Sequence, residues 1–135
     1  MLEVEVLITE RDAATGRIPP PEEIRRLCTM AADSAGLDEG HLAVEFVDEP
    51  RIAELNGRYR RRPRPTDVLS FPIDGAEPGE GPRELGDVLI CLQRTADVRE
   101  AIVHGVLHLL GMDHETDSGE MLLVQRELLA DRRSH

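Results

Sequence analysis

Three histidines in one short segment are the side chains of this sequence best suited to chemistry. His104 and His108 are four residues apart, and His114 follows six residues later. Side chains four apart on a helix lie one turn apart on the same face, so both imidazoles can reach one ion. Gly111 can adopt the left-handed conformation that ends a helix and turns the chain back, which brings His114 to the same point. The spacing therefore predicts a metal site made of three imidazoles.

Zinc is the metal that we expect at this site. Three neutral imidazoles leave a fourth tetrahedral position for water, which is the layout of a catalytic rather than a structural zinc site. Three unpaired imidazoles in an aliphatic segment would also be costly to bury without a shared partner. The sequence therefore predicts a Zn²⁺-dependent hydrolase. The remaining histidines, His41 and His135, stand alone and are expected at the surface.

The histidine spacing is also that of the metzincin proteases, H-E-x-x-H-x-x-G-x-x-H, apart from one position. Those enzymes carry the glutamate that serves as general base where this chain has Gly105. A glycine cannot take a proton from a metal-activated water, so the usual route of peptide hydrolysis is disfavoured. An atypical metzincin-like metalloprotease stays open as an alternative.

The overall charge argues against general binding of nucleic acid. The 135 residues carry a formal net charge of −11, and every basic residue is arginine rather than lysine. An acidic surface repels the phosphate backbone. Charges are screened beyond about 8 Å at physiological ionic strength, however, so a local basic cluster can still hold phosphate. Such a cluster, which could equally be a solvated loop, consists of Arg58, Arg60, Arg61, Arg62 and Arg64.

Aromatic residues and cysteines are scarce. Phe46, Tyr59 and Phe71 are the only aromatic side chains, so the core is aliphatic and a platform for stacking many bases is not expected. Cys28 and Cys91 are far apart in apolar stretches, which predicts buried free thiols rather than a disulfide.

The start of the chain is acidic where a signal peptide needs basic residues, and no apolar run approaches the length of a membrane span. We therefore expect a cytoplasmic protein that does not contact the membrane.

Hydrophobic periodicity predicts the elements that must position the histidines. Alternating apolar residues predict strands, the first two of them parallel because a helix connects them. These strands run through Leu2–Ile8, Leu42–Phe46, Val68–Phe71 and Leu85–Cys91. The Pro- and Gly-rich stretch 74–82 is most simply the connection of a hairpin.

Four segments have helical periodicity. A helix after Pro21 should bury Ile24, Leu27, Cys28, Ala31 and Ala35, and Asp48 should cap one that carries Ile52, Leu55 and Tyr59 on one face. A third helix should run from about Thr95 to Gly111, and Asp117 should cap a last helix whose inner face is Met121, Val124 and Leu128. The sum is a single α+β domain over residues 1–135, with a four-stranded mixed sheet covered by helices and the zinc site on a C-terminal helix and its following turn.

With these residues in place, the sequence resembles the YbeY family of single-strand-specific endoribonucleases, which act in ribosomal RNA maturation. The resemblance covers most of the chain after the first strand. It rests on the segment from Leu55 to Arg60, on the segment Pro65–Pro72 together with Leu85–Asp87, and on the segment from His104 to His114.

The resemblance implies a function and a set of site residues. His104, His108 and His114 would bind zinc, and Arg60 is similar to the family's functional arginine. The implied activity is that of a zinc endoribonuclease in 16S rRNA maturation and ribosome quality control, in which a metal-activated water attacks a phosphodiester. The implied partners are single-stranded RNA and the small ribosomal subunit. A non-catalytic, zinc-stabilised module that binds the ribosome is the second alternative.

Three further acids, Asp87, Asp113 and Glu115, are candidates for proton transfer or ligand support without an assigned role. Compared with the family, the stretch from Cys91 to His104 is expected to be short, so the helix that leads into the site should be reduced.

Overall fold

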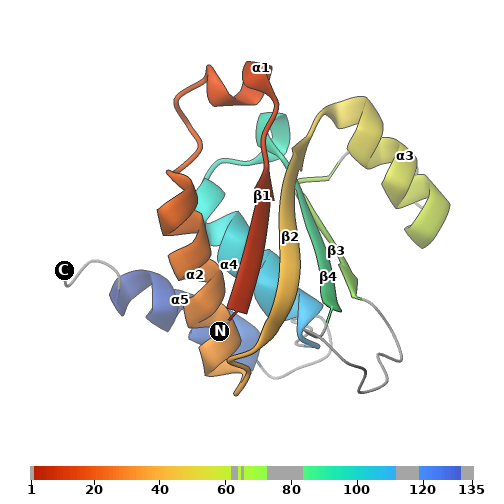
Figure 1. Ribbon diagram of the computed structural model, residues 1–135. Helices are drawn as coiled ribbons and strands as arrows, with labels where there is room; N and C mark the ends of the chain where they lie inside the picture. The colour runs from red at the N-terminus through yellow and green to blue at the C-terminus, as the bar shows by residue number, and fades with distance from the viewer. Residues whose placement is uncertain (1, 62–63, 65, 73–83, 112–118, 132–135) are drawn as a thin grey trace.

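One mixed sheet forms the centre of the protein, which we describe from a computed structural model covering residues 2–61, 64, 66–72, 84–111 and 119–131 (Figure 1). Its strands are β1 (Leu2–Leu7), β2 (Gly40–Val47), β3 (Val68–Pro72) and β4 (Glu84–Cys91). The order in the sheet is β1-β2-β4-β3. β1 and β4 run parallel to β2, whereas β3 is antiparallel to β4 and forms one edge. The predicted strands and the parallel start are confirmed.

Helices pack on both faces of this sheet. The described helices are α1 (Glu10–Ala13), α2 (Pro21–Ser34), α3 (Glu49–Arg60), α4 (Val98–Leu109) and α5 (Glu120–Asp131), with a 3-10 turn η1 at Leu92–Arg94. All of the α-helices except α1 contribute to the cores on the sheet. The larger core joins α2, α4 and α5 to β1, β2 and β4, and a smaller core lies between α3 and β2, β3 and β4. α3 stands apart from the other long helices (Figure 1). The predicted α+β class is confirmed.

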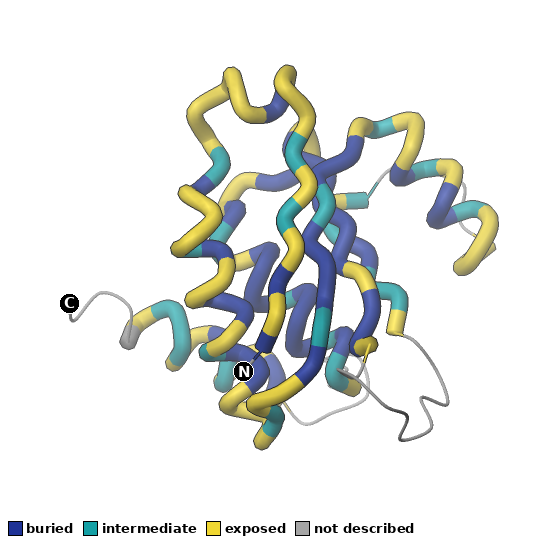
Figure 2. The backbone as a smooth tube through the Cα atoms, in the orientation of Figure 1, coloured by how far each residue is buried: buried dark blue, intermediate teal, exposed yellow. Residues whose placement is uncertain are grey.

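The two central strands separate these cores. In β4, Val88 and Ile90 belong to the larger core, while Leu89 and Cys91 belong to the smaller one. Successive side chains of a strand point to opposite faces, so a strand between two cores is apolar throughout. Figure 2 shows β2 buried along most of its length, whereas β1 alternates between buried and exposed residues.

Helix α2 begins at a proline, which suits the first helical position because its missing N–H would have no partner there. The predicted apolar face is confirmed except at its end. Ala35 is exposed, since the helix stops at Ser34, and Ala32 is buried in its place.

Helix α3 has the predicted cap, because an Asp48 carboxylate oxygen accepts the Arg51 N–H at 2.9 Å. Ile52 and Leu55 are buried against the sheet as predicted. Tyr59 continues the same face of the helix, as predicted. It is 61% exposed, because the last turn of α3 extends past the smaller core.

Helix α4 begins at Val98, a few residues after the predicted start at Thr95. A carboxylate oxygen of Asp97 accepts the Glu100 N–H at 3.1 Å and caps it. Gly111 follows the helix with a φ of 103°, which confirms its predicted role in ending it. α5 buries Met121 and partly buries Val124 and Leu128, as predicted.

Both cysteines are buried free thiols, as predicted. Burial raises the pKa of the Cys28 thiol to about 12. In the part of the chain that the structure describes, no helix has the length and apolar character needed to cross a membrane.

Candidate metal centre and its cavities

The position of α4 is set by a close approach to the sheet at Gly105. A Cβ at this residue would lie 2.5 Å from Val88 Cγ1 and 3.1 Å from Val68 Cγ2. The Ser70 hydroxyl donates a hydrogen bond of 2.7 Å to the Gly105 carbonyl oxygen, so β3 also holds the helix at this point. Any side chain at position 105 would therefore point into the sheet.

His104 and His108 lie together on α4, as their spacing predicts. Their ring centroids are 6.3 Å apart with an angle of 59° between the planes, and both residues are partly buried. Two imidazoles in this arrangement suit zinc, which accepts nitrogen ligands at about 2.0–2.1 Å.

The predicted third ligand, His114, lies outside the described residues. Within the described ranges, no group of three or more histidines, cysteines or acids is placed to hold a metal ion. The complete ligand set therefore stays a prediction.

A residue that the sequence analysis missed contacts the first histidine. Nδ1 of His104 lies 3.0 Å from the Gln125 side-chain oxygen, and Gln125 is buried on α5. An amide oxygen only accepts hydrogen bonds, so in the neutral ring Nδ1 carries the proton and Nε2 is the nitrogen that can bind a metal. Gln125 lies four residues after Met121 and so falls on the buried side of α5. Because its side chain is polar, the hydrophobic pattern did not identify it as a buried residue.

A cavity of about 400 Å³ opens beside the second histidine. We call it the His108 cavity, and its lining residues come from α3, from β3 and from the end of α4. They are Tyr59, Arg60, Ser70, Phe71, Pro72, His108 and Gly111. Helices α3 and α4 lie in different cores, and they share this cavity because β3 is the edge strand between them. The structure thus brings Arg60 and His108 together.

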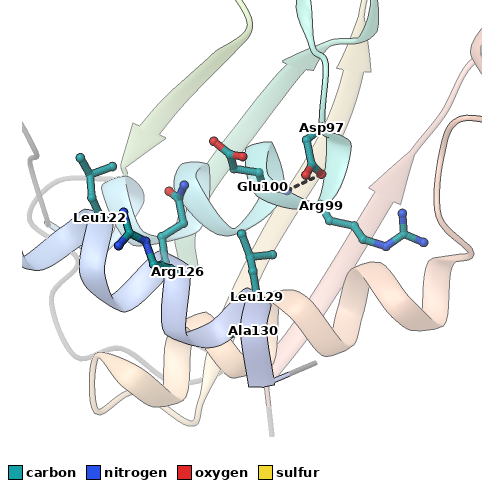
Figure 3. Close-up of a pocket in the computed structure, with 8 residues that line it drawn as sticks. Asp97, Arg99, Glu100, Leu122, Arg126, Leu129 and Ala130 are labelled. Atoms are coloured by element: carbon teal, nitrogen blue, oxygen red, sulfur yellow. Dashed lines mark hydrogen bonds between the residues drawn. The ribbon is translucent and has the colours of Figure 1, made fainter. Parts of the chain in front are cut away.

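A second cavity, of about 330 Å³, adjoins the first histidine. Its lining includes His104, Gln125 and the carboxylates of Asp67, Asp97 and Glu100. It continues into a groove of about 430 Å³ between α4 and α5, with which it shares several lining residues (Figure 3). Arg94 also lines this cavity, so the three acids outnumber the one base at His104, whereas the lining of the His108 cavity includes Arg60.

A buried side chain of α3 contacts the backbone at Arg64. The Asn56 amide donates a hydrogen bond of 3.0 Å to the Arg64 carbonyl oxygen. Arg61 ends the helix with a φ of 59°. Arg58 lies 3.8 Å from Glu54, an ion pair between two exposed side chains. Arg62 lies outside the described residues.

Of the three acids considered as proton-transfer groups, Asp87 is the one that lies within the described residues. Asp87 lies on β4, where partial burial and then the Glu84 carboxylate raise its pKa. Its other electrostatic neighbours are His41 and Glu5. Asp113 and Glu115 lie outside the described residues.

The fold and the site define an α+β protein with a histidine pair in a cleft beside an edge strand, and the comparisons with known proteins specify this further. The family model described as "Endoribonuclease YbeY" matches residues 17–132. The chain belongs to the YbeY family, as the resemblance predicted.

Individual relatives agree with this assignment. The chain is 39% identical over 132 residues to the Endoribonuclease YbeY of Rubrobacter xylanophilus, with 93% of each chain covered. It is 38% identical over 122 residues to that of Macrococcus caseolyticus, covering 78% of this chain and 79% of the relative. The solution structure of TM1509 from Thermotoga maritima has a similar fold, with a TM-score of 0.53 and 24% identity over 97% of this chain and 92% of that one.

Proposed function

We propose that this protein is a zinc-dependent endoribonuclease that cleaves single-stranded RNA. The observation that carries the proposal is the shared cavity of Arg60 and His108, one helical turn from His104. An arginine opposite a metal-binding histidine suits a phosphodiester, since the substrate needs both a cationic clamp and an activated water. The relatives of the chain are named Endoribonuclease YbeY.

The described donors fit a zinc ion. Two imidazoles lie on one face of α4, and the contact of Gln125 leaves Nε2 of His104 as the ligand atom. We propose His114 as the third ligand. Zinc, when bound, would polarise a phosphoryl oxygen as a Lewis acid and lower the pKa of a water towards about 7.

The side chain of Arg60 has the chemistry to bind the scissile phosphate. A guanidinium donates two parallel N–H bonds to phosphate oxygens and stays charged at any physiological pH. It would also oppose the negative charge that develops in the transition state. Arg60 lines the cavity at His108, whereas Asp67, Asp97 and Glu100 line the cavity at His104.

Position 105 argues against the protease alternative. A glutamate there would point into β3 and β4 and not towards the histidine rings. The structure thus offers no room for the general base at its metzincin position. No comparable structural argument opposes the alternative of a non-catalytic module that binds the ribosome. A test of RNA cleavage distinguishes that alternative from the enzyme.

The physiological substrate belongs to the proposal as well. From the family resemblance we propose precursor 16S rRNA on the small ribosomal subunit, cleaved in the cytoplasm during maturation and quality control.

The test is incubation with a single-stranded RNA and, separately, with an unfolded protein, each with and without a zinc chelator. We expect cleavage of the RNA only, lost with the chelator and restored by added zinc. Cleavage of the unfolded protein would support the metalloprotease instead. A zinc-loaded protein that leaves single-stranded RNA intact while binding the small subunit would support the non-catalytic module.

A further inference from the structure

The His108 cavity contains two of the three aromatic side chains of the protein. Tyr59 and Phe71 both line it, and the third, Phe46, is buried in the larger core. The chain has few aromatic residues, and two of them line the cavity of Arg60 instead of filling the larger core. Large exposed apolar groups are informative when they adjoin a site.

The two rings are held in a defined arrangement. Their centroids are 5.1 Å apart with an angle of 62°, an edge-to-face contact. Phe71 belongs to β3 and packs on the smaller core, and Gly86 on β4 approaches its backbone so closely that a Cβ there would collide with the Phe71 carbonyl oxygen. Phe71 therefore provides a rigid support, while Tyr59 remains 61% exposed.

We propose that Tyr59, supported by Phe71, stacks on an unpaired nucleobase next to the phosphate that Arg60 holds. The inference rests on the proposed function and names how the same cavity recognises its substrate. Tyr59 directly precedes Arg60 at the end of α3, so one helical turn presents a ring and a guanidinium to the same cavity. A base and its adjoining phosphate complement this pair, because the base offers a flat surface to the ring and the phosphate offers a negative charge to the guanidinium.

Stacking on a protein ring requires a base that has left its own helix, because bases in a duplex already stack on each other. A platform of this kind selects single strands without reading their sequence, since every base has a π-face. One ring serves one base, which agrees with the expectation that the chain lacks a platform for many.

The chain offers a direct reporter of this contact. It contains one tyrosine and no tryptophan, so its intrinsic emission comes from Tyr59 alone. We would titrate the zinc-loaded protein with a short 2′-O-methyl oligouridine, checked for integrity on a gel afterwards. The matched control is an abasic strand with the same number of phosphates.

We expect the oligouridine to quench the tyrosine emission and the abasic strand to leave it unchanged. The abasic strand should bind roughly 5- to 150-fold more weakly by anisotropy, the range that corresponds to loss of one stacked base. Equal quenching or equal affinity for the two strands would overturn the inference.

Variants separate stacking from packing. The Tyr59→Leu variant should bind the oligouridine more weakly than the wild type does, by the same factor, and should bind the abasic strand with wild-type affinity. The Tyr59→Phe variant should keep the higher affinity for the strand with bases. Thermal unfolding checks that both variants are folded. If Tyr59→Leu kept the wild-type preference, the inference would be wrong while the proposed function could stand. If the wild type bound neither strand, the proposed function would itself fail.

Discussion

The contact between Gln125 and His104 shows how a residue from another helix prepares a metal ligand. Ligand imidazoles generally donate their second N–H to an oxygen, which fixes both the tautomer and the orientation of the ring. In this protein the oxygen belongs to an amide 3.0 Å away. Gln125 is 7% exposed, so water cannot readily take its place.

Replacing Gln125 by Leu should weaken zinc binding about 10- to 100-fold, because the His104 ring loses its acceptor. Gln125→Glu is the matched variant and should keep most of the affinity, since a carboxylate also accepts from Nδ1. Competition with a chelator measures the affinity, and ¹⁵N NMR of the zinc-free protein reports which ring nitrogen of His104 carries the proton. Unchanged affinity in Gln125→Leu would contradict the assigned role.

At the scale of elements, α4 approaches β3 and β4 more closely than most side chains would permit. The contact of position 105 with Val88 and the hydrogen bond from Ser70 fix the helix against the sheet. The position of both histidines relative to β3 depends on this contact, and so does the His108 cavity.

Introducing glutamate at position 105, as in the metzincin pattern, should destabilise the protein and not create a protease. A buried charge without a partner costs about 3–5 kcal/mol of unfolding free energy. Leu123→Glu on α5 is the control, because Leu123 is 54% exposed and surface changes usually cost less than about 0.5 kcal/mol. Denaturant unfolding measures both. A stable Gly105→Glu variant that hydrolysed peptides would contradict the packing argument.

At the scale of the whole molecule, His41 connects three strands of the sheet through two carboxylates. His41 on β2 lies 2.9 Å from a Glu84 carboxylate oxygen on β4 and 3.8 Å from one of Glu5 on β1. The hydrogen bond to Glu84 is the main cause that raises the pKa of His41, and Glu5 and Glu3 add to it. The protonated imidazole therefore stabilises the folded state.

Since the folded pKa lies above the ordinary value of about 6.5, this stabilisation is fully present below pH 6.5 and disappears as the pH rises through the raised value. His41→Gln should therefore reduce stability more at pH 6 than at pH 9. The effect is small, because the histidine and its partners are partly exposed. Denaturant midpoints at the two pH values measure it, and an equal loss at both would show that the charge contributes nothing.

The sequence was sufficient to predict the strands and the pairing of the two histidines on one helix, because both follow from the spacing of residues that are close in sequence. Alternation predicted β1 and β2, and a spacing of four placed His104 and His108 on one helical face. Relations between distant elements were not visible. The meeting of Arg60 with His108 depends on the edge position of β3, which no local pattern encodes.

Single residues at the ends of elements were also hard to predict. Tyr59 continues the apolar face of α3, yet it is exposed because this end of the helix extends past the core. The helical periodicity alone does not predict where the sheet beneath the helix ends. Gln125 is a polar residue at a buried position. The structure explains this burial, because the Gln125 side chain contacts His104 on α4.

The central claim is that Arg60 acts on the phosphate in a cavity completed by a zinc-binding histidine. Its most direct test compares the RNA cleavage rate and the zinc content of Arg60→Ala with those of Arg51→Ala. Arg51 is an exposed arginine on the same helix, outside both the cavity lining and the basic cluster, so it is the matched control. His108→Ala serves as reference for loss of the metal.

We expect Arg60→Ala to lower cleavage about 100-fold or more, as loss of one transition-state donor does, with its zinc content unchanged. Arg51→Ala should stay close to the wild type in both measurements, and His108→Ala should lose zinc and activity together. An Arg60→Ala protein that cleaves single-stranded RNA at the wild-type rate would contradict the account.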